Sequence, residues 1–306
     1  MLRQMYISDN GKLQEDSNAE PLVYVYTAPT DEEKKQLIEQ YKIDEHTLNS
    51  SLDPDELSRL EFEPEHVAMI FKRPRHYAAE DNFLFRVAST GVFMFKDKLI
   101  IVTADDAPLF EGRPFVKVHS IQDIVLKMIN RSILHFLEHL KAIHELTGSI
   151  EQLISTSMEN KYLLNLFTLE KSLVYYLNAI NSNSVLIERL KNSAAKMDLT
   201  QEHIEILDDL AIENNQCREQ ANIYSQVLSS MMDARATIVA NNLNIRIKML
   251  TILTILIMVP TFVVSYFSMN VKLPLDHTSP LSFWIITAIG VLSSGVFAFL
   301  WWKRRW

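Results

Sequence analysis

The pattern of apolar and polar residues divides the chain into three regions. In the first, up to residue 119, short runs of β-branched and aromatic residues are flanked by turn formers, which is typical of strands. The capping-box pair Thr30 and Glu33 predicts a helix from Asp31 towards Tyr41. The strands on either side of residues 96–98 are expected to form a hairpin. The expected strands are Leu22–Tyr26, Val67–Lys72, Phe83–Ala88, Val92–Phe95, Leu99–Thr103 and Phe115–Val118.

The second region has no Gly or Pro from residue 149 to 259, and such a run is best explained by long helices. We expect helices over Ile121–Leu146 and about Asn160–Ala195. A third begins near Thr200 and has no stop signal before the third region. Its apolar residues recur at spacings of three and four, which predicts a seam for partner helices. The seam residues are Leu207, Leu210, Cys217, Ala221, Tyr224, Leu228, Met231, Ile238 and Ile245.

The third region contains two uncharged apolar stretches, Met249–Val271 and Leu281–Trp302. Each supplies the roughly 20 residues that a helix needs to cross a bilayer. Basic side chains lie at the outer ends of the stretches, at Arg246, Lys248, Lys303, Arg304 and Arg305, whereas the link between them has one basic and one acidic residue. By the positive-inside rule, both long ends face the cytoplasm. The N-terminus lacks the pattern of a signal peptide, so we expect no cleavage there.

Composition limits the partners. The 306 residues carry a net charge of −8, and residues 1–66 hold 16 acidic against 6 basic side chains. This imbalance favours cations and argues against nucleic acid, although a merely solvated acidic surface explains it equally well. The single Cys217 cannot form an internal disulfide, which suits a reducing compartment. We find no P-loop or Gly-rich phosphate cradle, so we expect no organic cofactor.

A polar stripe runs along the first apolar stretch at the helical spacing of three and four. Its eight positions, five of them hydroxylated, are Asn244, Ile247, Thr251, Thr254, Met258, Thr261, Ser265 and Ser268. Such a stripe suggests a shared lumen, which needs symmetry-related copies because one helix cannot enclose a pore. The alternative is that the hydroxyls bond to carbonyls of their own helix or hold neighbouring helices together.

The two-span hairpin, the long helix that runs into the first span, and Met269-Asn270 at its outer end resemble the CorA family of divalent cation channels. The resemblance covers the whole chain and includes Leu52-Asp53-Pro54, Arg59, Glu61, Glu63, Met258, Thr261 and Phe262. It implies an α+β/α membrane protein with an N-terminal α/β cytoplasmic domain, long stalk helices and two C-terminal transmembrane helices. It also implies a funnel-shaped homopentamer in the plasma membrane that contacts lipid and passes Mg²⁺, often also Co²⁺ and Ni²⁺.

The resemblance places the selectivity filter at Ser268, Met269 and Asn270. The family signature is Gly-Met-Asn, usually preceded by Tyr, and here Ser268 replaces the Gly and Phe267 the Tyr. Five Asn270 amides in a ring would accept hydrogen bonds from the water shell that Mg²⁺ retains. Alternatively, Asn270 simply caps the helix. A left-handed backbone is expected to cost more with Ser268 than with the Gly of the family signature. The transport rate or ion preference is therefore expected to differ from that of other family members. A further alternative is that the chain is a non-transporting relative.

The remaining site residues also follow from the resemblance. Pore-lining positions would be Asn244, Ile247, Thr251, Thr254, Met258, Thr261 and Ser265. Regulatory Mg²⁺ would bind Asp208 or Asp209 of one subunit and acidic residues of a neighbour among Glu61, Glu63 and Glu65, unless these are merely solvated. Lys303, Arg304 and Arg305 would form a basic collar or act only as a topology anchor. The membrane potential would drive entry of the cation.

The expected division of the chain has six parts. They are a cytoplasmic α/β domain at 1–119, a stalk region at 120–246, a first transmembrane helix at 247–270, an external loop at 271–280, a second transmembrane helix at 281–302, and a basic cytoplasmic tail at 303–306.

Three other functions remain open from the sequence. His135, Glu138 and His139 fit the inverted zinc-peptidase motif H-x-x-E-H, with Glu145 or Glu151 as a third ligand. This motif is short and lies on a long amphipathic helix without a suggested catalytic pocket, so we expect no enzyme. A membrane-anchored coiled-coil scaffold and a zinc transporter of the same architecture are the other two.

Overall fold

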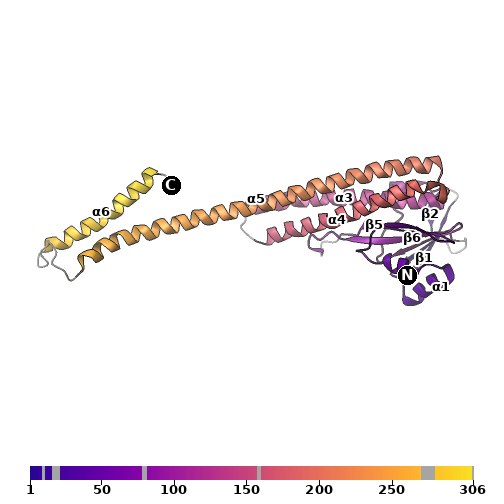
Figure 1. Cartoon of the computed structure of the whole chain (residues 1–306), viewed down its shortest axis with the longest axis horizontal. Helices are drawn as coiled ribbons and strands as arrows, with labels where there is room; N and C mark the ends of the chain where they lie inside the picture. Colours follow the sequence, from indigo (N-terminus) through magenta and orange to yellow (C-terminus); the bar gives the residue numbers. More distant parts are fainter. Residues whose placement is uncertain (9–10, 16–20, 78–80, 157–159, 270–279, 305–306) are drawn as a thin grey trace. The chain divides into compact units, whose positions relative to one another are not determined.

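The computed structural model describes residues 1–304 except for 9–10, 16–20, 78–80, 157–159 and 270–279. The chain divides into two compact units, Met1–Met232 and Asp233–Trp306 (Figure 1). The helices are α1 (Asp31–Tyr41), α2 (Glu45–Ser50), η2 (Arg113–Val116), α3 (Ile121–Thr156), α4 (Asn160–Asn192), η3 (Ala194–Met197), α5 (Gln201–Phe267) and α6 (Pro280–Arg304), where η marks a 3₁₀ helix. Helix α5 contributes residues to both units.

A sheet of seven strands lies at the centre of the first unit, counted over the described residues. The strands are ordered β2-β1-β3-β7-β6-β5-β4. Strands β3 and β7 pair in parallel, and the other neighbours pair antiparallel. The strands are β1 (Leu2–Ile7), β2 (Leu13–Gln14), β3 (Val23–Thr27), β4 (Arg59–Phe62), β5 (Val67–Pro74), β6 (Val87–Met94) and β7 (Leu99–Thr103).

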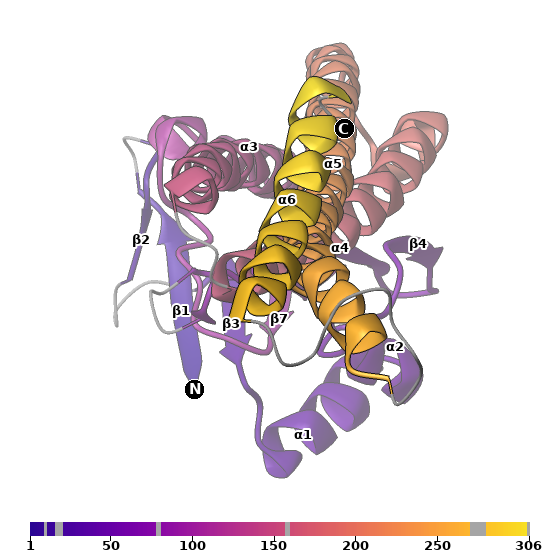
Figure 2. The same ribbon diagram turned by 90° about the vertical axis from the view of Figure 1, so that its left-hand side faces the viewer.

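Helices cover both faces of this sheet, which explains why its central strands are apolar throughout. In β7, Leu99 and Ile101 pack into the core beneath α3 and α4, whereas Ile100 and Val102 pack against α1 and α2. This alternation follows from the two-residue period of a strand. Figure 2 shows the two helix layers on opposite sides of the strands.

A buried amide fastens α4 to the sheet. The side chain of Asn183 accepts a hydrogen bond from the backbone N of Lys72 at 2.8 Å and donates one to the backbone O of the same residue at 2.8 Å. Lys72 lies in β5 beyond Arg59, the first β4 residue that pairs with this strand. The Asn183 amide therefore supplies the two backbone bonds that a longer β4 would supply.

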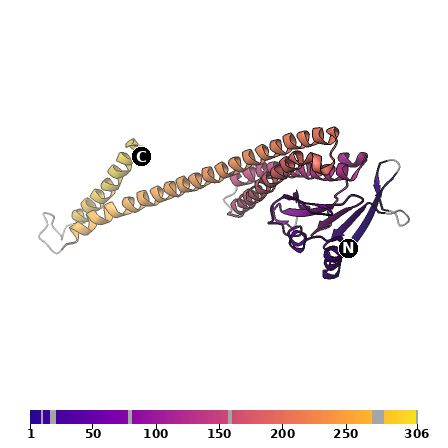
Figure 3. The ribbon, with the colours of Figure 1, turned by 45° about the vertical axis from the view of Figure 1, so that its right-hand side comes forward.

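Helices α3, α4 and the first part of α5 lie side by side above the sheet (Figure 3). Asn214 of α5 donates to the backbone O of Ile180 at 3.1 Å and to Ser184 Oγ at 2.7 Å, both on α4. His144 of α3 stacks on Tyr224 of α5, with ring centroids 4.9 Å apart. The seam predicted on α5 is buried in this bundle at Leu207, Leu210, Cys217, Ala221 and Leu228.

Several sequence-based expectations about the elements are confirmed. The capping box at Thr30 and Glu33 is present and starts α1 at Asp31. Strands β6 and β7 form the expected hairpin, with Met94 paired to Leu99. Helix α5 runs without a break from Gln201 to Phe267, as the lack of stop signals predicted.

Other expectations were wrong. The segment expected as a strand at Phe115–Val118 overlaps the 3₁₀ helix η2. Pro114 in that helix has no backbone N–H to give to a ladder, which opposes a strand. The strand expected at Phe83–Ala88 begins only at Val87, because Asn82 and Phe83 have positive φ angles of 48° and 67° that turn the chain. Helix α3 also continues ten residues past Leu146, to Thr156.

The second unit consists of the second part of α5 and of α6, and both have the length and apolarity needed to cross a membrane. The two helices approach each other at Gly290, where an added Cβ would lie 3.6 Å from Val264 Cγ2. A small residue at this point lets the backbones come close. Pro260 lies within α5, which remains helical around it.

Candidate functional site

The predicted polar stripe lies on a side of α5 that α6 leaves mostly uncovered. The partly buried residues of α5 that recur at spacings of three and four are Ile252, Ile255, Val259, Val263 and Phe267. Ile252 and Ile255 line a cavity shared with α6, which identifies this side of α5 as the one nearest α6. Five of the stripe positions, Thr251, Thr254, Met258, Thr261 and Ser265, are exposed in the single chain. Because one residue turns a helix by about 100°, the centre of the stripe lies roughly 140° around α5 from the α6 side, and Thr251, at the nearer edge of the stripe, also lines that cavity.

The threonine hydroxyls of the stripe bond to their own helix. Thr251 donates to the backbone O of Ile247 at 2.9 Å, Thr254 to that of Leu250 at 2.8 Å, and Thr261 to that of Ile257 at 2.7 Å. This is the pattern that the alternative interpretation of the stripe expected. A hydroxyl that donates its hydrogen still has oxygen lone pairs free to accept. The exposed stripe therefore presents acceptors and no free hydroxyl donors at these three threonines.

The outer end of α5 has ordinary backbone geometry. The helix ends at Phe267, and both the backbone N and the Oγ of Ser268 donate to the backbone O of Ser265, at 3.2 and 2.8 Å. Ser268 is not among the described residues with a positive φ angle, so its backbone is not left-handed here, and the effect of a close approach at Ser268 stays a prediction. Met269 is 53 % exposed. Asn270 lies outside the described residues.

One chain does not bring the expected regulatory acids together. Asp208 forms an ion pair with Lys191, and Glu61 lies 3.4 Å from Arg59 Nε and accepts from Thr47 Oγ1 at 3.1 Å. Within the described ranges, no group of three or more His, Cys, Asp or Glu side chains is arranged to hold a metal ion. Asp209, Glu63 and Glu65 form no ion pair within the described residues, and the intersubunit site stays a prediction.

At the other end of the second unit, α6 ends at Arg304, and Lys303 is exposed. The side chain of Arg304 and all of Arg305 lie outside the described structure. The expected basic collar is therefore represented by Lys303 alone in the part of the chain that the structure describes.

The candidate peptidase residues do not form a zinc site. His139 Nδ1 lies 2.5 Å from the hydroxyl of Tyr176, and Glu138 pairs with Arg131 at 3.0 Å. Burial lowers the pKa of His135 to about 4 and that of His139 to about 3, with nearby positive charge adding to both shifts. The two imidazoles are partly buried and packed edge to face, with ring centroids 4.4 Å apart. These packing contacts account for the three residues of the motif without a zinc ion.

Sequence reasoning missed the buried ammonium of Lys72. It donates to the backbone O of Pro54 and to Ser89 Oγ, each at 2.8 Å, and burial lowers its pKa to about 8. These bonds hold in place the Leu52-Asp53-Pro54 segment. A lysine inside an apolar strand was the available signal, since Lys is almost never buried without partners.

Comparisons with known proteins agree with this arrangement. The family model described as "CorA-like Mg2+ transporter protein" matches residues 22–304. A curated relative, the "Cobalt/magnesium transport protein CorA" of Methanocaldococcus jannaschii, is 25% identical over 293 residues, which are 91% of this chain and 89% of that protein.

Solved structures share the whole fold. The complete structure of the CorA magnesium transporter from Methanocaldococcus jannaschii matches with a TM-score of 0.82 at 21% identity, and covers 98% of this chain and 97% of its own. The full-length CmaX protein matches with a TM-score of 0.75 at 13% identity, and covers 99% and 98%. The resemblance and the fold class predicted from the sequence are thus confirmed. The chain belongs to the CorA-like Mg²⁺ transporter protein family and is a membrane transporter of divalent cations, not an enzyme.

Proposed function

We propose that five copies of this chain surround a pore lined by the polar stripe of α5, and that hydrated Mg²⁺ enters the cytoplasm through it. The observation that carries the proposal is the run of exposed acceptors on α5, on a side that α6 leaves mostly uncovered. One copy cannot enclose a lumen, so the uncovered side needs symmetry-related partners. The number of five copies follows from the family resemblance.

The chemistry of the stripe suits a hydrated cation. Mg²⁺ gives up its water reluctantly and keeps several water molecules when bound. Those waters point hydrogens outward, and the oxygens of Thr251, Thr254 and Thr261 can accept them. Met258 and Ile247 would form apolar constrictions that can gate by dewetting, and Asn244 would form a polar ring at the cytoplasmic mouth.

The filter would be formed by Ser268, Met269 and above all Asn270. In a ring, five amide oxygens would contact the water shell and not the ion itself. An inside-negative potential contributes about 2.3 kcal/mol per charge per 100 mV, and about twice that for a divalent ion. No second energy source is required for entry.

The proposed regulation places Mg²⁺ between cytoplasmic units of adjacent copies. Asp209 would supply a carboxylate from α5, and Glu63 or Glu65 would supply others from the neighbour. Both glutamates are exposed in the single chain and so are accessible to a partner. Mg²⁺ binding there would hold the pore closed when the cytoplasmic concentration is high.

Flux into liposomes tests the proposed function. The purified chain should pass Mg²⁺ down an imposed inside-negative potential, and Asn270→Ala should abolish this flux while the oligomer remains intact on size-exclusion chromatography. Unchanged flux in Asn270→Ala would rule out the filter. The same assay with Co²⁺, Ni²⁺ and Zn²⁺, with and without a pH gradient, separates a Mg²⁺ pathway from a zinc transporter, and absence of flux for every ion would favour a scaffold.

A further inference from the structure

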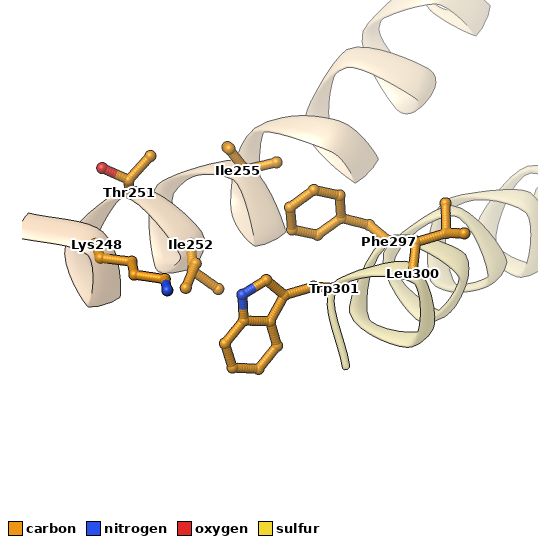
Figure 4. Close-up of a pocket in the computed structure, with 7 residues that line it drawn as sticks. All are labelled: Lys248, Thr251, Ile252, Ile255, Phe297, Leu300 and Trp301. Atoms are coloured by element: carbon orange, nitrogen blue, oxygen red, sulfur yellow. The ribbon is translucent and has the colours of Figure 1, made fainter. Parts of the chain in front are cut away.

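A cavity of about 590 Å³ lies between α5 and α6 within the second unit (Figure 4). The helices approach at Gly290 and Val264 and diverge towards the C-terminal end of α6, which opens the space between them (Figures 1 and 3). Its volume falls within the range of roughly 300–1,000 Å³ that is usual for small-molecule sites. It is lined by Lys248, Thr251, Ile252 and Ile255 of α5 and by Phe297, Leu300 and Trp301 of α6.

The lining is apolar except at one end. The rings of Phe297 and Trp301 extend from α6 towards Ile252 and Ile255 (Figure 4). Thr251 donates its hydroxyl hydrogen to the backbone O of Ile247, so it offers only an acceptor. Among the described lining residues, only Lys248 carries a charge, at its ammonium. The cavity thus combines a long apolar surface with one positive charge.

Within the described second unit, no Asp or Glu side chain lies close to that charge. The sequence has no Asp or Glu from residue 234 to 275 or from 277 to 306. Among the described residues, Lys248 takes part in no salt bridge. A ligand that is complementary to the cavity must therefore be apolar along its length and negatively charged at one end.

The position of the cavity along the spans indicates the kind of amphiphile. Lys248 and Trp301 lie at the ends of the spans where Arg246 and Lys303 also occur. Trp and basic residues are enriched at the membrane interface, and basic ends mark the cytoplasmic leaflet. That leaflet carries the anionic lipids.

We infer that this cavity binds an anionic phospholipid of the cytoplasmic leaflet. An acyl chain lies between Ile252, Ile255 and Phe297, and the headgroup phosphate pairs with Lys248. The Trp301 indole sits beside the glycerol region. The inference rests on the membrane orientation assumed in the proposed function, but it requires neither conduction nor the Asn270 filter.

Lipid retention tests it directly. The full chain is purified in detergent, incubated with equal amounts of phosphatidylglycerol and phosphatidylcholine that have identical acyl chains, and the retained lipids are quantified by mass spectrometry. The wild-type chain should retain an excess of phosphatidylglycerol. Lys248→Gln should lower the ratio of the two lipids about fivefold, because one lysine near an anionic headgroup contributes about that factor.

Arg246→Gln is the matched control, because it removes the same charge from the same helix about 200° around the axis. It should leave the ratio unchanged. An equal fall in both variants would show a general surface-charge effect and overturn the site. Ile255→Trp, which fills the cavity, should lower the retention of both lipids while the oligomer persists.

If Ile255→Trp instead breaks the oligomer, a second copy of the chain occupies the cavity. If it leaves lipid retention unchanged, nothing occupies the cavity. Either result would make the inference wrong. Because lipid retention is measured without ion flux, a failure of the proposed conduction would leave this result intact. Conversely, loss of the lipid site would not remove flux through a pore lined by Thr254 and Thr261.

Discussion

At the scale of single residues, burial decides what a motif means. His135, Glu138 and His139 have the spacing of a zinc peptidase, but Tyr176 occupies Nδ1 of His139 and Arg131 pairs with Glu138. Both imidazoles are held neutral, because burial disfavours the charged form. They are partly buried beside the core, and we expect their titration to make the fold sensitive to acid.

That sensitivity is testable. In the unfolded chain a histidine titrates near 6.5, whereas the folded-state pKa values are about 4 for His135 and about 3 for His139. The unfolded chain therefore binds more protons as the pH falls below about 6.5, and stability is lost between that pH and about 3. His139→Gln should lessen the fall in Tm between pH 7 and pH 5, measured by far-UV circular dichroism of the full chain in detergent.

His46→Gln is the control for this prediction, because His46 is exposed at the start of α2. It should leave the pH dependence of Tm as it is in the parent. If the two variants flatten the pH dependence equally, the buried imidazoles are not its source.

At the scale of elements, a threonine side chain of α5 can donate a hydrogen bond within its own helix and still offer an oxygen as an acceptor. The hydroxyls of Thr251, Thr254 and Thr261 donate to the preceding turn, and their oxygens remain exposed as acceptors. Intrahelical bonding and a polar lumen were alternatives when only the sequence was considered. In the structure the threonine hydroxyls form the intrahelical bonds, and their exposed oxygens are still able to line a polar lumen.

Thr261→Val should separate the two roles. The change keeps the shape of the side chain but removes an acceptor from each copy, and the intrahelical bond is lost with little effect on the helix. We expect Mg²⁺ flux into liposomes to fall about fivefold, since a hydrogen bond contributes roughly 1 kcal/mol. Thr287→Val on α6 removes an equivalent intrahelical hydroxyl, which donates to the backbone O of Phe283 at 2.9 Å, and should leave flux unchanged. Equal losses would remove the stripe from the conduction path.

Apart from β1, which has six residues, the strands and the α-helix that the sequence failed to predict are short and polar. Strand β4 contains Arg59 and Glu61, strand β2 has two residues, and α2 has six. These lack the length from which a periodic pattern can be detected. Strand β4 forms because the edge of β5 is free to pair with it. Beyond the end of β4, the backbone N and O of Lys72 in β5 bond instead to the side-chain amide of Asn183, which lies on α4 and is distant in sequence.

At the scale of the whole molecule, the proposed pore requires more than one copy of the chain. Within the described residues, α6 leaves the polar side of α5 mostly uncovered, and the proposed regulatory acids form no group of three metal-binding side chains. Both features fit a protein whose function resides in an assembly. The assembly, unlike the family, is a proposal.

Regulation provides the test at this scale. Asp209→Asn should raise the internal Mg²⁺ concentration that closes the pore about tenfold, because a charge-assisted contact is worth roughly 1.5 kcal/mol or more. The measurement is flux into liposomes preloaded with increasing Mg²⁺. Asp208→Asn is the matched control: its carboxylate already pairs with Lys191, so a smaller shift is expected. A larger shift in Asp208→Asn would reassign the ligand.

The sequence alone determined the two membrane spans, their expected orientation, the polar stripe and the long unbroken helix, because these depend on local periodicity and on charges close in the chain. Tertiary structure decided which side of α5 faces α6, that His139 contacts Tyr176 and packs edge to face with His135, and that Lys72 is buried beside Pro54. It also revealed the cavity beside Lys248. These properties depend on contacts between residues far apart in the sequence, and side-chain packing, which no local pattern records, settles them.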